Sequence, residues 1–209
     1  TGAGNDQVRF DMIFHIMIPG IEIITPIRDL KLSREQEIEY LKSKGVEMNF
    51  EKSMYSINKG LWGTSIGGKE TLSSKGMLPE EAWPTQVTKS GSEEVRLGFE
   101  KGELQTINDK RFNHPSEAIQ YLQTIAGPYG IGRDIHVGDT IIGIKGRVGF
   151  EAAAPMVILK AHHALEKHVL TKWQLQWKDQ LSLFYGNWLH EGQILDPVMR
   201  DIESFFQHS

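Results

Sequence analysis

The sequence predicts an α+β fold, with an antiparallel sheet and packed helices, preceded by a short α/β segment. Helical and strand-like patterns alternate over the first 45 residues, as in the last unit of a parallel α/β sheet whose other strands are missing. A hairpin pattern and stretches rich in Gly, Ser and Pro follow, and the sequence after residue 154 predicts three successive helices. We therefore predict two domains, at residues 1–45 and 46–209.

The first segment predicts two helices on either side of a buried, β-branched strand, over residues 5–17, 21–25 and 34–44. Gly4 or Asn5 is a suitable N-cap for the first helix. Ser33 and Gln36 form a capping-box sequence at the second helix, and Gly45 is a typical residue just beyond its end.

The second segment predicts a mixture of loops, strands and helices. Residues 55–91 lack periodicity and predict a functional loop system. The expected elements beyond it are a hairpin at 95–99 and 104–107, a helix at 115–126, a strand region at 135–145, and helices at 155–170, 171–191 and from 197. The helix at 171–191 carries apolar residues at helical spacing, which predict packing in a core or between copies: Trp173, Trp177, Leu181, Phe184 and Trp188.

Composition narrows the functional classes. The 209 residues carry 23 Lys and Arg against 27 Asp and Glu, so the net charge of −4 gives no general attraction to nucleic acid or to an anionic membrane. The absence of Cys excludes disulfides and thiol chemistry. No apolar run approaches the roughly 18 residues of a membrane span, and no signal peptide is found. We expect a cytoplasmic protein and, because dense turn sequence starts at residue 1, a piece of a longer chain.

Two patterns imitate functional sites. Residues 63–69 match the spacing of a phosphate-binding P-loop, but Glu70 stands where a hydroxyl would meet Mg²⁺. His162, His163 and His168 fall on one predicted helix, with the last two five residues apart, which is poor geometry for metal ligands. We therefore predict no phosphate loop and no metal site here.

The start of the first helix has the features of a site for a zwitterionic small molecule. Gly2 and Gly4 allow close approach of the backbone, and a helix N-terminus presents free N–H groups to a carboxylate. Asn5, Asp6 and Arg9 are spaced to converge near one helix face. Arg9 offers a fork for a second carboxylate and Asp6 an acceptor for an ammonium group. A capped helix with an internal ion pair explains the same residues equally well.

Residues 1–10, Thr-Gly-Ala-Gly-Asn-Asp-Gln-Val-Arg-Phe, resemble the T-G-x-G-N-D-Q-x-R-F signature of the argininosuccinate synthase family. This first motif is highly specific. The resemblance spans most of the chain, through shorter motifs in the family's order at residues 23–28, 55–65, 127–133, 145–147, 161–166 and 178–183.

The resemblance implies a ligase of arginine biosynthesis that joins citrulline to aspartate at the expense of ATP, releasing AMP and pyrophosphate. The family has an N-terminal ATP-pyrophosphatase domain with an S-G-G-x-D-T-S loop, then a synthetase domain and an oligomerisation tail. That loop is absent from residues 1–209. We therefore expect the synthetase domain preceded by a remnant of the nucleotide domain. The isolated chain should be inactive, and the whole protein should be a homotetramer that uses ATP with Mg²⁺.

The resemblance also assigns roles to single residues. It places aspartate on Thr1, Asn5 and Asp6, and citrulline on Asn5, Arg9, Ser56 and Ser65. Adenylylation makes the ureido oxygen a good leaving group, so the protein mainly aligns the aspartate amine against that carbon. Asp6 is the candidate catalytic residue, as an acceptor that helps to deprotonate the amine.

The chain departs from the family pattern at positions that contact citrulline. Gly138 replaces a Glu and Phe150 replaces a Tyr, and a buried ammonium without its partner costs on the order of several kcal/mol. Asp139 could substitute through a shift of one residue, or citrulline could bind through other groups. Alternatively, the substrate is an N-acylated citrulline, with its acyl group in the room left by Gly138, Gly146 and Gly149. The family's H-I-S-x-E is also changed, to Gly-Thr-Ser-Ile-Gly at residues 63–67.

Two alternatives come from other functional classes. The first is a non-catalytic amino-acid-binding or assembly domain with a decayed citrulline pocket, and an S-G-G-x-D-T-S loop upstream would argue against it. The second is an N-terminal threonine hydrolase with the Thr1 amine as base. Such enzymes place this residue at the end of a strand, whereas a Gly-rich turn and a helix follow it here.

Overall fold

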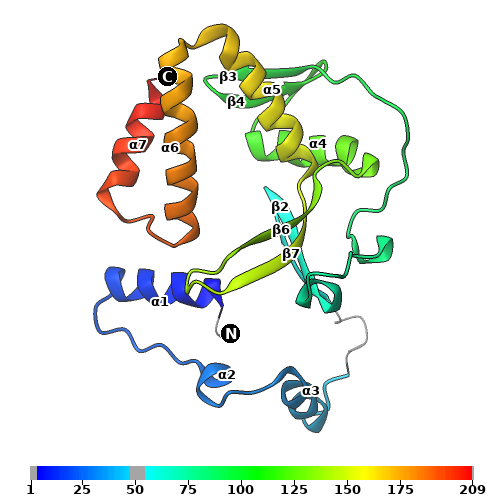
Figure 1. Cartoon of the computed structure of the whole chain (residues 1–209), viewed down its shortest axis with the longest axis vertical. Coiled ribbons are helices and arrows are strands. Elements are labelled where there is room, and N and C mark those ends of the chain that lie inside the picture. Colours follow the sequence, from blue (N-terminus) through cyan, green and yellow to red (C-terminus); the bar gives the residue numbers. More distant parts are fainter. Residues whose placement is uncertain (1–3, 48–54, 209) are drawn as a thin grey trace. The chain divides into compact units, whose positions relative to one another are not determined.

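A computed structural model describes residues 4–47 and 55–208, which form two compact units (Figure 1). The first unit contains residues 4–47, 139–145 and 170–208, and the second contains 55–138 and 146–169. Each unit therefore combines segments that are distant in the sequence.

The first unit is helical. Its helices are α1 (Asn5–Met17), α2 (Pro26–Asp29), α3 (Arg34–Ser43), α6 (Lys172–His190) and α7 (Pro197–Gln207). Three of them begin at side-chain caps: Ser33 and Thr171 form capping boxes, and the Asp196 carboxylate accepts a hydrogen bond from the Val198 N–H. These helices confirm the sequence-based predictions, because caps are local signals.

The strand predicted at residues 21–25 is wrong. This segment lies outside any strand, and the Ile24 side chain is 79% exposed. A strand needs hydrogen-bonding neighbours along its edges, and within the described residues no other strand of the first unit supplies them. The α/β pattern is therefore present in the sequence without a sheet to complete it.

The second unit contains a four-stranded sheet in the order β1-β2-β7-β6, formed by β1 (Tyr55–Gly60), β2 (Gly63–Gly68), β6 (Arg133–Asp139) and β7 (Lys145–Glu151). The prediction of loops is wrong at 55–68, where β1 and β2 form an antiparallel hairpin. Sequence periodicity missed it because five of the six residues of β1 are exposed, so no apolar alternation marks it. The strand predicted at 135–145 is half right: β6 ends at Asp139, and a turn precedes β7.

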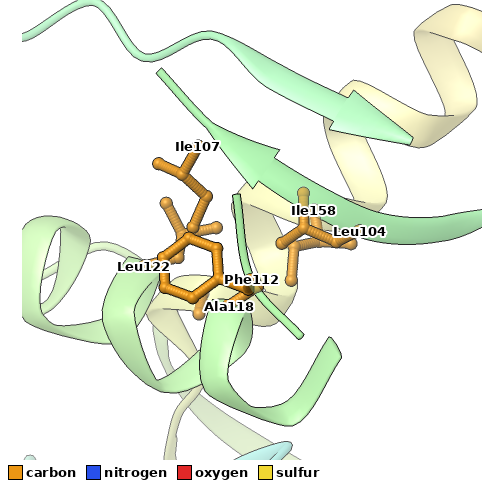
Figure 2. Packing of buried hydrophobic residues seen from close by; sticks show 7 residues of the cluster. Leu104, Ile107, Phe112, Ala118, Leu122 and Ile158 are labelled. Atoms are coloured by element: carbon orange, nitrogen blue, oxygen red, sulfur yellow. The ribbon is translucent and has the colours of Figure 1, made fainter. Parts of the chain in front are cut away.

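A second sheet, β3-β4-β5, carries the main apolar core of this unit. Its strands are β3 (Leu97–Glu100), β4 (Glu103–Ile107) and β5 (Lys110–Arg111), and the helices packed with it are α4 (Pro115–Ala126) and α5 (Ala153–Val169). Figure 2 shows how the buried side chains meet between these elements, from Leu104 and Ile107 on β4 to Leu122 on α4 and Ile158 on α5. This core confirms the α+β prediction and both predicted elements, the hairpin and the helix at 115–126.

The aromatic stripe of α6 is not a core. Trp173, Trp177 and Phe184 are 62%, 56% and 57% exposed, and no residue of α6 is buried. Packing between copies, the other half of that prediction, stays a prediction. Among the helices that the structure describes, none has the length and apolar character needed to cross a membrane.

Candidate functional site

The first turn of α1 is the centre of the candidate site in the first unit. Gly4 is the N-cap, and no capping side chain accepts a hydrogen bond from the first N–H groups of the helix. The Asn5 Oδ1 atom accepts a hydrogen bond of 2.9 Å from the Ile141 N–H. This bond fixes the loop at 139–145 beside the helix N-terminus.

A cavity of about 210 Å³ lies next to this turn. It is lined by Gly4, Asn5, Gln7, Val8, Arg28, Thr140, Ile142 and Ile144. Its walls are mostly apolar, with polar groups supplied by the helix N-terminus and by Asn5, Gln7, Arg28 and Thr140. A cavity of this kind can take a small ligand that has one polar end.

Asp6 and Arg9 converge as their spacing predicts. The Arg9 Nη1 atom donates to the Asp6 Oδ1 atom at 2.7 Å, and the Asp6 side chain is 75% exposed. Arg9 also donates to His190, at the C-terminal end of α6 and 181 residues away in the sequence. Sequence reasoning missed His190, and no local signal marks it, because only the fold brings the two segments together.

A polar cluster around the buried Gln7 lies in the same part of the first unit. Gln7 is 5% exposed and its Nε2 atom donates to Asp11 at 2.7 Å, while Arg28 donates to the other carboxylate oxygen of Asp11 at 2.7 Å. The hydrogen bond from Arg28, followed by that from Gln7, lowers the pKa of Asp11. Arg28 is therefore paired at neutral pH, and the cluster fixes α1 relative to the α2 segment.

The serine residues assigned to citrulline lie in the second unit. Ser65 on β2 is directly opposite Phe150 on β7 and Asn58 on β1, so these three side chains share one face of the sheet. Ser56 shares this face because it lies two residues before Asn58. On the opposite face, Ile66 of β2 is fully enclosed. The sheet thus brings together Ser56, Ser65 and Phe150 on its open face.

Neighbouring rings occupy the space at Gly138, which departs from the family pattern, and at Gly63. A Cβ atom on Gly138 would lie 2.6 Å from the Nε2 atom of His136, and one on Gly63 would lie 2.5 Å from the Phe150 ring. Gly149 is closed as well, because a Cβ atom there would overlap the Leu78 side chain. The expectation that Gly138 and Gly149 leave room for an acyl group is therefore wrong, since side chains already occupy that space.

Two arginine residues in the motifs shared with the family bind neighbouring loop segments of the second unit through hydrogen bonds. The Arg147 guanidinium donates to the carbonyl oxygens of Glu70 and Ser73, which fixes the segment after β2. Arg133 donates to Glu80 at 2.7 Å and to the Thr85 carbonyl, and its guanidinium lies 5.0 Å from the Trp83 ring. The hydrogen bond from Arg133 lowers the pKa of Glu80.

The patterns that imitate functional sites have structural roles. Residues 63–68 form strand β2, so their N–H groups are used along a sheet and do not converge on a phosphate. His162 and His163 contact the buried Glu166 carboxylate at 2.8 and 3.4 Å. Within 4–47 and 55–208, no group of three or more His, Asp or Glu is arranged to hold a metal ion. Thr1 lies outside the described residues, so its assignment stays a prediction.

Comparisons with known proteins cover the whole chain. A family model described as "Arginosuccinate synthase C-terminal domain" matches residues 55–209, and one described as "Arginosuccinate synthase N-terminal HUP domain" matches residues 1–47. The chain is similar to curated proteins named argininosuccinate synthase. That of Methanocaldococcus jannaschii is 40% identical over 98% of this chain and 52% of its own length. Those of Methanococcus maripaludis and Xanthomonas campestris are 37% and 34% identical over 98% and 100% of this chain, and over 53% and 54% of their own lengths. The chain thus spans about half the length of these curated relatives.

Proposed function

Since the chain belongs to the argininosuccinate synthase family, we propose that it is the synthetase portion of an ATP-dependent ligase that joins aspartate to a citrulline-type acceptor. The products are argininosuccinate or its N-acyl form, AMP and pyrophosphate, as a step of arginine biosynthesis. One observation carries the proposal: at the start of α1, Asp6 and Arg9 form an ion pair, and Asn5 of the same turn lines a cavity of about 210 Å³.

The domain division and the assembly are part of the same proposal. Residues 1–45 belong to the nucleotide-binding domain and 46–209 to the synthetase domain, in a cytoplasmic homotetramer. Residues 63–68 form strand β2 and supply no phosphate loop for ATP. In our proposal the protein uses ATP with Mg²⁺, and the nucleotide loop is not among residues 1–209.

In the proposed reaction, the main task of the site is to align the aspartate amine with the ureido carbon. The ureido oxygen of the acceptor leaves as AMP once it is adenylylated, and the aspartate amine attacks the carbon that carried it. In our proposal Thr1, Asn5 and the α1 N-terminus hold aspartate, and the exposed Asp6 carboxylate accepts a proton from its amine. Arg9 binds the carboxylate of the acceptor, together with Ser56 and Ser65.

N-acylcitrulline is a second candidate acceptor. The absence of a carboxylate at position 138 favours it. Gly138 has no side chain, and the His136 imidazole lies where one would begin, so this position offers no carboxylate for a free ammonium group. An acyl group removes that charge from the substrate.

Pyrophosphate release by the full-length protein, with ATP and aspartate, tests the proposal. Citrulline, N-acetylcitrulline and N-succinylcitrulline are compared as acceptors, and Arg9→Gln should reduce release with the preferred one at least about tenfold, since Gln keeps two N–H donors but loses the charge. Release with free citrulline as the best acceptor would rule out the N-acyl substrate. No release with any acceptor would support instead the alternative of a non-catalytic amino-acid-binding or assembly domain.

A further inference from the structure

The C-terminal end of α6 holds Arg9 through two acceptors on one residue. The Arg9 Nε atom donates to the His190 carbonyl oxygen at 2.7 Å, and its Nη2 atom lies 3.0 Å from the His190 Nδ1 atom. A guanidinium group has only donors, so Nδ1 accepts in this pair. The interaction therefore requires a neutral His190 ring with its hydrogen on Nε2.

The backbone at Gly192 packs closely against the Arg9 side chain. Gly192, just beyond α6, has a φ of +81°, and a Cβ atom there would lie 3.2 Å from the Arg9 Cγ atom and 2.8 Å from the Met12 Cε atom. Any other residue at 192 would be strained and would press on the stem of Arg9. The end of α6 thus encloses Arg9, whose side chain is 28% exposed.

The remaining donors of Arg9 suit a carboxylate. Partners among the described residues use three of the five N–H donors: Nε and one on Nη2 bind His190, and one on Nη1 binds Asp6. One donor then remains on each terminal nitrogen, and a carboxylate that binds in bidentate fashion needs two parallel donors.

We propose that His190 is a positioning residue, which fixes the Arg9 guanidinium so that it binds the acceptor's carboxylate without first being ordered. This inference rests on the proposed function, in which Arg9 binds the acceptor. Ordering a long side chain on binding costs affinity, and a guanidinium that is already held avoids most of this cost. The effect should therefore appear in acceptor binding and not in the chemical step.

His190→Ala in the full-length protein tests this, with pyrophosphate release measured for the preferred acceptor. The variant keeps the backbone carbonyl and loses Nδ1. We expect its KM for the acceptor to rise about tenfold, the size of one hydrogen bond to a charged group. The KM values for aspartate and ATP and kcat should change less than about twofold. His190→Asn should restore most of the affinity, because its Oδ1 atom can accept near the position of Nδ1.

His208→Ala is the matched control, because the His208 Nδ1 atom contacts the Ser204 carbonyl on its own helix at 2.7 Å. It should leave all four constants unchanged. An unchanged acceptor KM in His190→Ala overturns the inference, as does a uniform loss in which His190→Asn gives no rescue. Absence of release by the wild-type protein with every acceptor overturns the proposed function instead, together with the role of Arg9 on which this inference depends.

Discussion

Helices α4 and α6 both carry apolar residues at helical spacing, yet only α4 buries them. Ala118, Leu122 and Ala126 on α4 are at most 4% exposed, against strand β4 and helix α5. On α6, Trp173 and Trp177 remain more than half exposed. The comparison shows that a periodic apolar stripe predicts a helix but does not reveal which surface, if any, covers it.

The two helices also begin differently. Thr171 starts α6 with a capping box, whereas no side chain caps α4 at His114. Apolar burial can hold a helix whose first turn is uncapped, because tertiary packing supplies most helical stability in proteins. A helix without buried residues depends more on its local signals.

The largest expected effect comes from opening the core under α4. Leu122→Ala removes a side chain that is fully buried and should lower the free energy of unfolding by about 2–5 kcal/mol. Denaturant unfolding measures the loss, and hydrogen exchange should locate it in peptides of α4 and β4. Trp177→Ala is the matched change on α6, and we expect it to cost less than about 0.5 kcal/mol. An equal cost for both variants would contradict the comparison and indicate that another surface covers α6.

An intermediate effect should follow from removing the cap of α6. Thr171→Ala deletes the hydroxyl that accepts from the Gln174 N–H, and should cost about 1 kcal/mol. Peptides from the first turns of α6 should exchange hydrogen faster, while those of α4 stay unchanged. Thr171→Ser keeps the hydroxyl and should behave as the wild type. If protection in α6 survives Thr171→Ala, tertiary contacts hold this helix after all.

We expect the smallest effect from the ion pair of Glu80 and Arg133, which contributes to the stability of the second unit through charge and not through buried apolar area. The pKa of Glu80 is lowered from 4.5 by Arg133, so the folded state binds this proton less tightly than the unfolded state. Its stabilising contribution is present above pH 4.5 and is lost as the pH falls through the lower folded-state pKa. Thermal unfolding between pH 3 and 7 should therefore show a shallower acid decline in Glu80→Gln. Identical pH profiles for the two proteins would show that this exposed pair contributes nothing.

The sequence-based predictions that were confirmed depend on residues close together in the sequence, and those that failed depend on distant segments. The caps at Ser33, Thr171 and Asp196 and the turn between β3 and β4 were predictable because residues only a few positions apart determine them. The hairpin at 55–68 was missed since its open face carries no apolar alternation. The strand at 21–25 failed for the opposite reason: its pattern is right, but the first unit offers no described strand to pair with it.

By itself, the sequence determined the helices, the family and the convergence of Asp6 with Arg9, all of which depend on neighbouring residues or on a contiguous motif. The tertiary structure alone decided that His190 holds Arg9 from 181 residues away, and that the Phe150 ring fills the space at Gly63. Such contacts join segments whose sequences carry no record of each other, because a pairing across a fold is set by how all the elements pack and not by any local spacing.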